Sequence, residues 1–321
     1  MVSTTRVFDV ADLASDDPSV RVRTTARALS MLEDGAPDVP AMMATLVSAG
    51  LTTRVIGITG PPGVGKSTVV AGLVAALRAA RQRVGVIAVD PTSPFSGGAV
   101  LGDRVRMQQH ALDNGVFIRS MASRGHLGGL SAVTPQAVRV LAAAGCDVVL
   151  VETVGVGQSE VDVAGLADTT VVVLAPGNGD SMQAAKAGIL EIADIYLVNK
   201  ADRDGAAGVV SDLRGMLTLV RRSPGDWRPP VPTSIAVDSD GLSELISDLA
   251  AHEHWLSTSG TLRPRREARA RAEIESVALA ELRRQLLAVR GDRSLPELAR
   301  RVAAGELDAF TAATTWTGPA G

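Results

Sequence analysis

The residues whose types and spacing carry the clearest chemistry form the segment Gly60-Pro61-Pro62-Gly63-Val64-Gly65-Lys66-Ser67-Thr68, which has the pattern Gly-x-x-x-x-Gly-Lys-Ser/Thr. In this pattern the glycines let backbone N–H groups wrap a phosphate chain, because a Cβ atom would clash there. The lysine neutralises the β- and γ-phosphate oxygens, and the hydroxyl that follows it reaches a magnesium ion. We therefore predict that this segment binds a nucleoside phosphate, with Lys66 on the phosphates and Ser67 on magnesium.

A second motif, Asn199-Lys200-Ala201-Asp202, follows the apolar run 193–198. An aspartate carboxylate accepts two hydrogen bonds from guanine N1–H and N2–H, whereas adenine offers no such pair of donors. Asp202 is therefore the predicted guanine reader, and Asn199 and Lys200 are predicted to brace the base and the phosphate loop. Alone, the tetrapeptide is also typical of an ordinary turn at a strand end. Together with the phosphate loop it indicates a GTPase that binds GTP and GDP.

The segments between the two motifs contain candidates for magnesium binding and water positioning. Asp90 ends a predicted strand, and Asp103 lies in the glycine-rich segment 95–106, which either closes over the γ-phosphate or is an ordinary loop. Glu152 ends another buried run, where it can hold magnesium directly or through water. Gly155 lets the backbone approach the γ-phosphate, and Gln158 is a candidate for orienting the attacking water.

These residues are expected to lie at the ends of strands in a doubly wound α/β sheet with a mostly parallel core. In such sheets ligands bind at the carboxyl ends of the strands, so the loops that follow them should converge on one nucleotide. A helical stripe is predicted directly after the phosphate loop, at Val70, Leu73, Val74 and Leu77. Strands are predicted at 54–59, 84–89, 116–119, 148–152, 170–174, 195–198 and 231–236.

Three regions are predicted: a helical N-terminal extension (1–51), a P-loop GTPase domain (52–258) and a helical C-terminal extension (259–321). The first contains predicted helices over 22–32 and 39–47. The third contains one long helix with an apolar stripe that packs either on the chain's own GTPase domain or across a homodimer. The stripe consists of Ile274, Ala278, Leu282, Leu286 and Val289. The tail, residues 311–321, is expected to be poorly ordered.

An arginine run opens this C-terminal extension, at Arg263, Arg265, Arg266, Arg269 and Arg271. Such a run is compatible with nucleic-acid binding or with a solvated helix face. Acidic residues interrupt it, the chain has a net charge of −3, and no aromatic platform accompanies it. We therefore expect a solvated face and no nucleic-acid partner.

The composition bounds the class of protein further. The chain has 321 residues, 46% of them hydrophobic, which is typical of a soluble globular protein. Its single cysteine, Cys146, excludes an intrachain disulfide, and no leader is evident, so a cytoplasmic location is expected. No apolar run approaches the ~18 residues of a membrane span. The four histidines form no ligand cluster.

Together, these motifs resemble the GTPase chaperones of adenosylcobalamin-dependent methylmalonyl-CoA mutase, a family also called arginine/ornithine transport kinases. The resemblance covers roughly residues 25–265. It rests on the phosphate loop, on Asp90-Pro-Thr-Ser with Ser96-Gly-Gly and Leu101-Gly-Asp-Arg, on Glu152-Thr-Val-Gly-Val-Gly-Gln-Ser-Glu, and on Asn199-Lys-Ala-Asp. The stretch that begins at Glu152 is specific to this group.

The resemblance implies a homodimeric G protein that docks on the mutase and uses GTP to gate cofactor loading and to protect the enzyme. It implies metal and switch roles for Asp90, Asp103 and Glu152. It also implies that Gln183 and Lys186 move toward the nucleotide when the mutase binds, although the sequence alone favours a surface helix lysine at position 186.

The last base-contacting loop departs from the family pattern, because Ile235 stands where the family usually has serine. Backbone contacts from Ile235 and Ala236 to guanine O6 are still expected. Two other functions stay open: a nickel metallochaperone GTPase, which normally carries Cys or His ligands that are missing here, and a small-molecule kinase of a transport system. Asp202 disfavours the kinase because it selects GTP over ATP.

Overall fold

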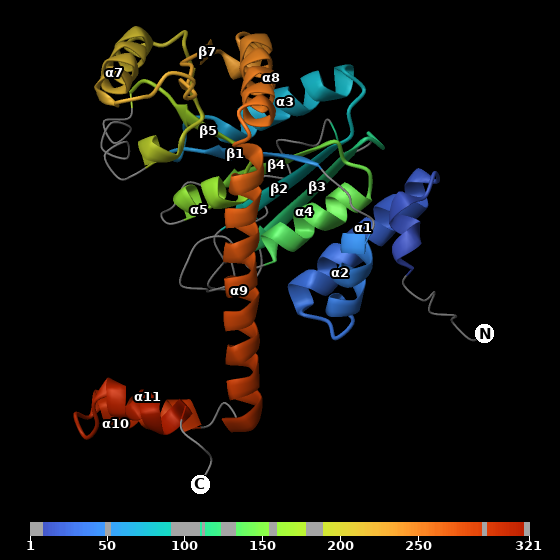
Figure 1. The fold of residues 1–321 in the computed structure, drawn as a ribbon, viewed down its shortest axis with the longest axis vertical. Coiled ribbons are helices and arrows are strands. Elements are labelled where there is room, and N and C mark those ends of the chain that lie inside the picture. The colour runs from blue at the N-terminus through green and yellow to red at the C-terminus, as the bar shows by residue number, and fades with distance from the viewer. Residues whose placement is uncertain are drawn as a thin grey trace. The chain divides into compact units, whose positions relative to one another are not determined.

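A seven-stranded parallel sheet forms the centre of the chain (Figure 1). The computed structural model describes residues 9–48, 53–90, 110, 113–122, 133–153, 159–177, 189–290 and 294–317. Within these residues the strand order is β3-β2-β4-β1-β5-β6-β7 and all neighbouring strands are parallel. The strands are β1 (Arg54–Thr59), β2 (Val84–Asp90), β3 (Val116–Ala122), β4 (Val148–Thr153), β5 (Thr169–Leu174), β6 (Ile195–Asn199) and β7 (Thr233–Ser234). The predicted doubly wound fold is confirmed.

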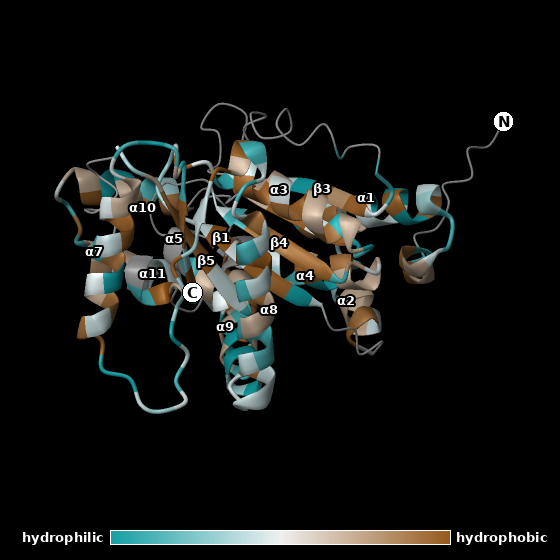
Figure 2. Cartoon of the chain, turned by 90° about the horizontal axis from the view of Figure 1, so that it is seen from above, coloured by the Kyte–Doolittle hydropathy of each residue, from teal (hydrophilic) through white to brown (hydrophobic). Residues whose placement is uncertain are grey.

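Buried β-branched residues explain why these segments form central strands. Every residue of β4 and β5 is buried, as expected for strands covered on both faces. Figure 2 shows the strands as a hydrophobic layer between the helices. One face is covered by α3 (Lys66–Ala79) and α8 (Leu242–Thr258).

The other face is covered by helices that include the N-terminal ones, α1 (Pro18–Asp34) and α2 (Val39–Ser48), together with α4 (Thr134–Ala143) and α5 (Ser159–Leu166). Leu29 of α1 and Leu46 of α2 pack in the same buried cluster as Val149 of β4. The helix α7 (Ala206–Leu219) packs on β5 and β6. The predicted domain boundaries at residues 51 and 258 stay predictions.

Two strands differ from their predicted lengths by more than one residue. The last strand, β7, contains only Thr233 and Ser234 of the predicted 231–236. The reason is the proline-rich segment before it, since a proline has no N–H to donate to a sheet. Pro230 and Pro232 only accept, from the N–H groups of Tyr196 and Val198 at 3.0 Å each. The strand β3 is longer than predicted and pairs with β2 along its full length, to Ala122.

The arginine run after residue 262 binds acidic residues of the sheet, so the predicted solvated face is wrong for three of its members. These are Arg265, Arg266 and Arg269, in the first turns of α9 (Leu262–Arg290). Arg265 binds both carboxylate oxygens of Asp194 at 2.8 and 3.0 Å. Arg266 binds Asp168 at 3.1 and 3.2 Å. Both aspartates are nearly buried and directly precede β5 and β6. The arginine run alone does not indicate that its side chains meet these aspartates.

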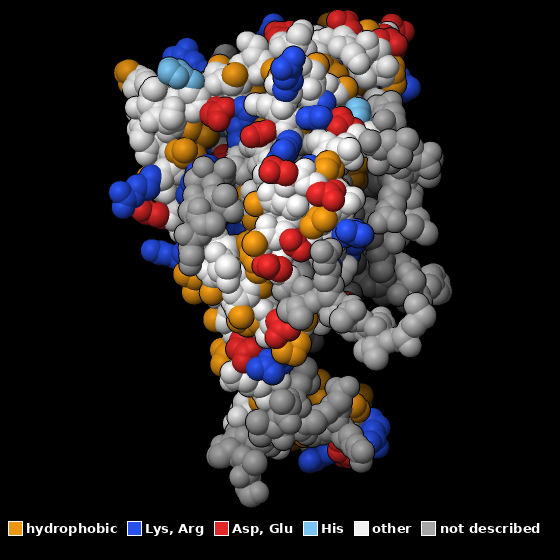
Figure 3. Space-filling view, turned by 90° about the vertical axis from the view of Figure 1, so that its right-hand side faces the viewer, with side chains coloured by type: hydrophobic (Ala, Val, Ile, Leu, Met, Phe, Trp, Pro, Cys, Tyr) orange, Lys and Arg blue, Asp and Glu red, His pale blue; other side chains and the backbone are white. Residues whose placement is uncertain are grey.

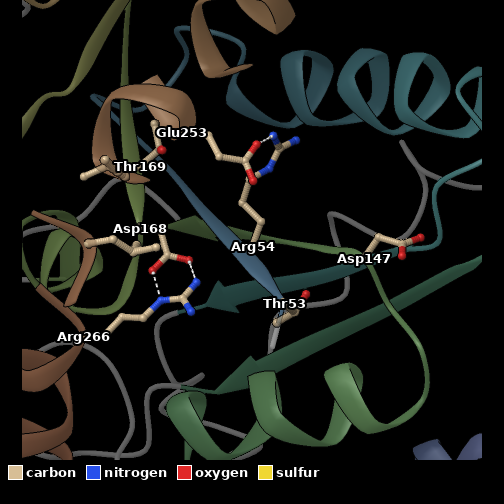
Figure 4. Close-up of a pocket in the computed structure, with 9 residues that line it drawn as sticks. Thr53, Arg54, Asp147, Asp168, Thr169, Glu253 and Arg266 are labelled. Carbon is tan, nitrogen blue, oxygen red and sulfur yellow. Dashed lines mark hydrogen bonds and ion pairs between the residues drawn. The ribbon is translucent and has the colours of Figure 1, made fainter. Parts of the chain in front are cut away.

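A pocket of about 270 Å³ lies beside this cluster, at the amino ends of the strands (Figure 4). Arg54 of β1 binds Glu253 of α8 on one side of it, and Asp168 binds Arg266 on the other. A carboxylate oxygen of Asp147 accepts the Arg83 N–H at 2.7 Å. The charged groups that line the pocket are thus occupied with protein partners, so we regard the pocket as part of the anchor of α9.

The remainder of α9 forms a second unit, Ala270–Gly321, with α10 (Ser294–Ala303) and α11 (Ala309–Thr317). The prediction of a poorly ordered tail is wrong for 311–317, because Asp308 begins α11 by accepting the N–H groups of Phe310 and Thr311 at 2.9 Å. Residues 318–321 lie outside the described residues. Ile274 and Leu282 of the predicted apolar stripe are 69% and 61% exposed.

The surface of the chain mixes charges of both signs. On the face drawn in Figure 3, acidic and basic side chains are interspersed. None of the helices among the described residues is long and apolar enough to cross a membrane.

A buried histidine, His252, connects α8 to the sheet. Its Nδ1 lies 2.8 Å from the Thr169 hydroxyl and its Nε2 lies 3.4 Å from Asp194. The rings of Trp227 and Trp255 lie 4.7 and 5.6 Å from it, centre to centre. Burial lowers the pKa of His252 and outweighs the opposite effect of the Asp194 carboxylate.

This histidine predicts acid sensitivity of the fold. The folded chain holds His252 neutral, whereas the unfolded chain protonates it near its ordinary pKa of about 6.5. The free energy of unfolding should therefore fall as the pH drops below about 6.5, since the unfolded state then binds more protons. Urea denaturation at several pH values checks this. His252→Gln should show a smaller fall, and His254→Gln, an exposed neighbour on the same helix, should behave as the wild type. An unchanged fall in His252→Gln contradicts the prediction.

Candidate nucleotide-binding site

The phosphate loop connects the end of β1 to the start of α3, which begins at Lys66. Helix N-termini bind phosphate through free backbone N–H groups and the helix dipole. Lys66 and Ser67 are each only 7% exposed. The ammonium group of Lys66 donates to the carbonyl oxygens of Gly60 and Pro61 at 2.5 and 3.0 Å, which places it inside the loop.

The hydroxyl of Ser67 meets a buried carboxylate at the end of β4. Ser67 donates to Glu152 Oε1 at 2.6 Å, and Glu152 is only 1% exposed. A hydroxyl and a carboxylate are hard oxygen ligands of the kind that magnesium takes, usually one or two per site beside waters and substrate phosphates. Among the described residues, no group of three or more acidic, His or Cys side chains is arranged to hold a metal ion, and a magnesium site of this kind needs none. The pair Ser67 and Glu152 therefore fits magnesium.

The predicted guanine loop is tied directly to the phosphate loop. Asn199, only 3% exposed, donates from Nδ2 to the carbonyl of Val64 at 2.9 Å. Its Oδ1 accepts the Ser234 hydroxyl and the Ala236 N–H at 3.1 Å each. Lys200, with a positive φ of 58°, donates to the carbonyl of Gly63 at 2.6 Å. Asn199, at the end of β6, thus joins the phosphate loop to the end of β7 and the segment that follows it.

Asp202 lies in the turn that these bonds position. The turn is fixed by the Ala201 N–H, which donates to the Ser234 carbonyl at 3.0 Å, and by the Arg203 N–H, which donates to the Lys200 carbonyl at 3.0 Å. The Asp202 side chain is exposed, as a carboxylate that reads a base must be. Its contact with guanine stays a prediction.

The N–H groups of Ile235 and Ala236 are both bonded within the protein. The first donates to the Asp240 carbonyl at 3.1 Å, and the second donates to Asn199. The Ala236 N–H therefore helps to hold the guanine loop through Asn199, and the contact of both residues with guanine O6 stays a prediction.

The side chains of the other predicted site residues lie outside the part of the chain that the structure describes. Asp90 ends β2, at the same edge of the sheet, but its side chain lies outside the described residues. Asp103, Gly155, Gln158 and the two predicted switch residues, Gln183 and Lys186, also lie outside them.

The sequence reasoning missed Ser234 and a hydroxyl pair at the ends of β1 and β4. Ser234 supplies both a hydroxyl and a carbonyl to the guanine loop. The Thr153 hydroxyl donates to the Thr59 hydroxyl at 3.0 Å, and both are fully buried. The sequence contains a signal for both threonines, since Thr59 directly precedes the phosphate loop and Thr153 directly follows Glu152.

The parallel sheet, the glycine-rich loop before α3 and the adjoining guanine loop define a P-loop GTPase. The family model of the "Methylmalonyl Co-A mutase-associated GTPase MeaB" matches residues 25–290. The chain belongs to this family and is a GTPase that binds guanine nucleotides.

Relatives agree with this family. A protein of Pyrococcus abyssi, itself named as a GTPase, is 44% identical over 91% of this chain and 90% of its own length. The GTPase ArgK of Escherichia coli is 38% identical over 76% of each chain. A mouse protein named methylmalonic aciduria type A homolog is 39% identical over 68% of this chain and 53% of its own length.

A solved structure has the same fold. The crystal structure of a LAO/AO transport system kinase superposes with a TM-score of 0.68 and 26% identity, covering 99% of this chain and 98% of the other.

The phosphate loop predicts a sharp difference between two glycines. Gly60 and Gly63 both have positive φ, 137° and 79°, but only at Gly60 would a Cβ meet another strand, 2.1 Å from the carbonyl oxygen of Val173. At Gly63 no atom lies within 4 Å. We expect Gly60→Ala to lower the free energy of unfolding by about 1–3 kcal/mol more than Gly63→Ala does. Urea denaturation without nucleotide measures this difference, and equal losses would contradict the described packing of the loop.

Proposed function

We propose that this chain is a GTP-hydrolysing chaperone of an adenosylcobalamin-dependent methylmalonyl-CoA mutase, which gates cofactor loading and protects the enzyme. The observation that supports this most is the match to the mutase-associated GTPase family over residues 25–290. The matched region contains a phosphate loop and a guanine loop that Asn199 joins by a hydrogen bond. The mouse relative named after methylmalonic aciduria also supports a link to this metabolism.

The proposed chemistry assigns each described residue one task. The backbone N–H groups of the phosphate loop and Lys66 bind the β- and γ-phosphates. Asp202 accepts the guanine N1–H and N2–H, while Asn199 holds the loop that carries it. Ser67 and Glu152 hold magnesium, with Asp90 and Asp103 as further candidates. Bound magnesium neutralises charge that develops on the phosphate oxygens.

The lysine content of the chain supports a role for Lys186. The chain has 32 lysine and arginine residues, and only three are lysines: Lys66, Lys186 and Lys200. Two of the three donate to carbonyl groups of the phosphate loop. A lysine is a compact point charge, whereas arginine is a wide planar fork. In a chain whose other basic residues are arginines, the lysine at position 186 favours a site that needs the compact charge, as a phosphate contact does.

The assembly and location are part of the same proposal. The exposed Ile274 and Leu282 support a homodimer in which a second copy covers this stripe of α9. The free Cys146 is buried, and burial raises the pKa of its thiol to about 12, so it stays a protonated thiol at neutral pH. A reduced cysteine is in keeping with a cytoplasmic location.

Mutase-gated hydrolysis tests this proposal. Because a positive charge supplied near the γ-phosphate is worth ~10³-fold or more in phosphoryl transfer, methylmalonyl-CoA mutase should raise the GTP turnover of the wild type. The ratio of stimulated to unstimulated turnover should collapse in Lys186→Ala and fall partly in Lys186→Arg. Arg23→Ala, an exposed change on α1, is the control and should keep the wild-type ratio.

If the mutase neither binds nor stimulates the wild type, the chaperone proposal fails while the GTPase assignment stands. If the mutase stimulates Lys186→Ala as strongly as the wild type, the role of Lys186 fails alone.

A further inference from the structure

An open groove of about 660 Å³ runs beside the last strands of the sheet, away from the phosphate loop. One wall is the C-terminal half of α7, and the other is the segment 228–232, which leads into β7. The prolines of this segment, Pro229, Pro230 and Pro232, line the groove. Neither wall belongs to the magnesium and phosphate site.

The groove is basic in a chain that is acidic as a whole. Arg214, Arg222 and Arg228 line it, against a single acid, Glu244, whereas the chain has a net charge of −3. Arg222 donates to the carbonyl of Leu217 at 3.1 Å. Arg214 and Arg228 are exposed, and neither side chain has a hydrogen bond or an ion pair with another described residue. Their charges are thus available to a partner.

Apolar side chains accompany these arginines. Leu219 and Val220, at the end of α7, are 81% and 51% exposed, and Val220 lines the groove. Protein interfaces are enriched in arginine beside apolar contact area, and their strongest contacts often involve arginine. The groove therefore has the composition of a protein-docking surface that would receive acidic and apolar side chains together.

Both walls are connected to the guanine loop, one through hydrogen bonds and the other as the far half of the helix that follows this loop. The carbonyl groups of Pro230 and Pro232 accept the N–H groups of β6, the strand that ends at Asn199. Two residues after Pro232, the Ser234 hydroxyl donates to Asn199 and its carbonyl accepts the Ala201 N–H. The other wall, α7, begins at Ala206, just after Asp202. A shift of either wall would act on the loop that is proposed to read guanine.

We propose that this groove docks an acidic segment of the mutase, one that also carries an apolar side chain, and that docking there changes how tightly the guanine loop holds the nucleotide. This inference rests on the proposed function, because the mutase is the partner to which it commits. Charge complementarity supports the acidic character of the segment. If docking changes nucleotide affinity, the nucleotide must change mutase affinity by the same factor.

Charge reversal tests the groove. The affinity of methylmalonyl-CoA mutase is measured for the wild type, Arg214→Glu and Arg228→Glu. We expect each reversal to weaken binding by about tenfold or more, because like charges then face each other across the interface. Arg23→Glu makes the same change of charge at an exposed site on α1 and should bind as the wild type does. The wild-type affinity should also fall with rising salt concentration.

A second readout separates docking from a general loss of charge. The rate of GDP dissociation is measured with and without mutase. The mutase should change this rate in the wild type and in Arg23→Glu. In Arg214→Glu the change should be far smaller. If both groove variants bind mutase as tightly as the wild type, the groove proposal is overturned and the proposed function stands. If the wild type does not bind mutase, the proposed function fails, and the groove proposal fails with it.

Discussion

The side chain of Asn199 is the contact on which the nucleotide site depends. It is buried at the end of β6, and its three hydrogen bonds reach Val64 in the phosphate loop, Ser234 at the end of β7 and Ala236 beyond that strand. A buried amide with three hydrogen bonds fixes the groups around it, because a displacement would break bonds that water cannot replace. The loop that holds phosphate and the loop proposed to read the base are thereby one rigid unit.

The parallel sheet makes this contact possible, and it places the nucleotide site and the anchor of α9 at opposite edges. The carboxyl ends of β1, β4 and β6 meet at one edge, where Lys66, Glu152 and Asn199 gather. At the opposite edge, the aspartates that precede β5 and β6 bind arginines from the first turns of α9. The strands β5 and β6 therefore span the sheet from the anchor of α9 to the nucleotide edge, and the basic groove lies beside β6 on the same unit.

Local patterns in the sequence predict the strands and the two nucleotide loops, because these features depend on residues that are neighbours in the chain. Apolar runs predict the strands, and the loop motifs predict where Lys66 and Asn199 lie. The pairing of Arg265 with Asp194 and of Arg266 with Asp168 depends on which helix face meets which strand end, so a run of arginines looks solvated until the fold is known. Pro230 and Pro232 in the sequence indicate that β7 is short. The bonds of Ser234 to the guanine loop cannot be predicted without knowing the register of β6 and β7.

Base selectivity tests the central claim most directly, since the account makes Asp202 the guanine reader in a loop that Asn199 holds. Equilibrium binding of GTP, ATP and XTP to the wild type and to Asp202→Asn measures it. The wild type should prefer GTP, and Asp202→Asn should lose about 2–3 kcal/mol of GTP affinity, as expected for a charged acceptor that faces two donors, and gain preference for XTP. Equal binding of ATP and GTP by the wild type would contradict the account.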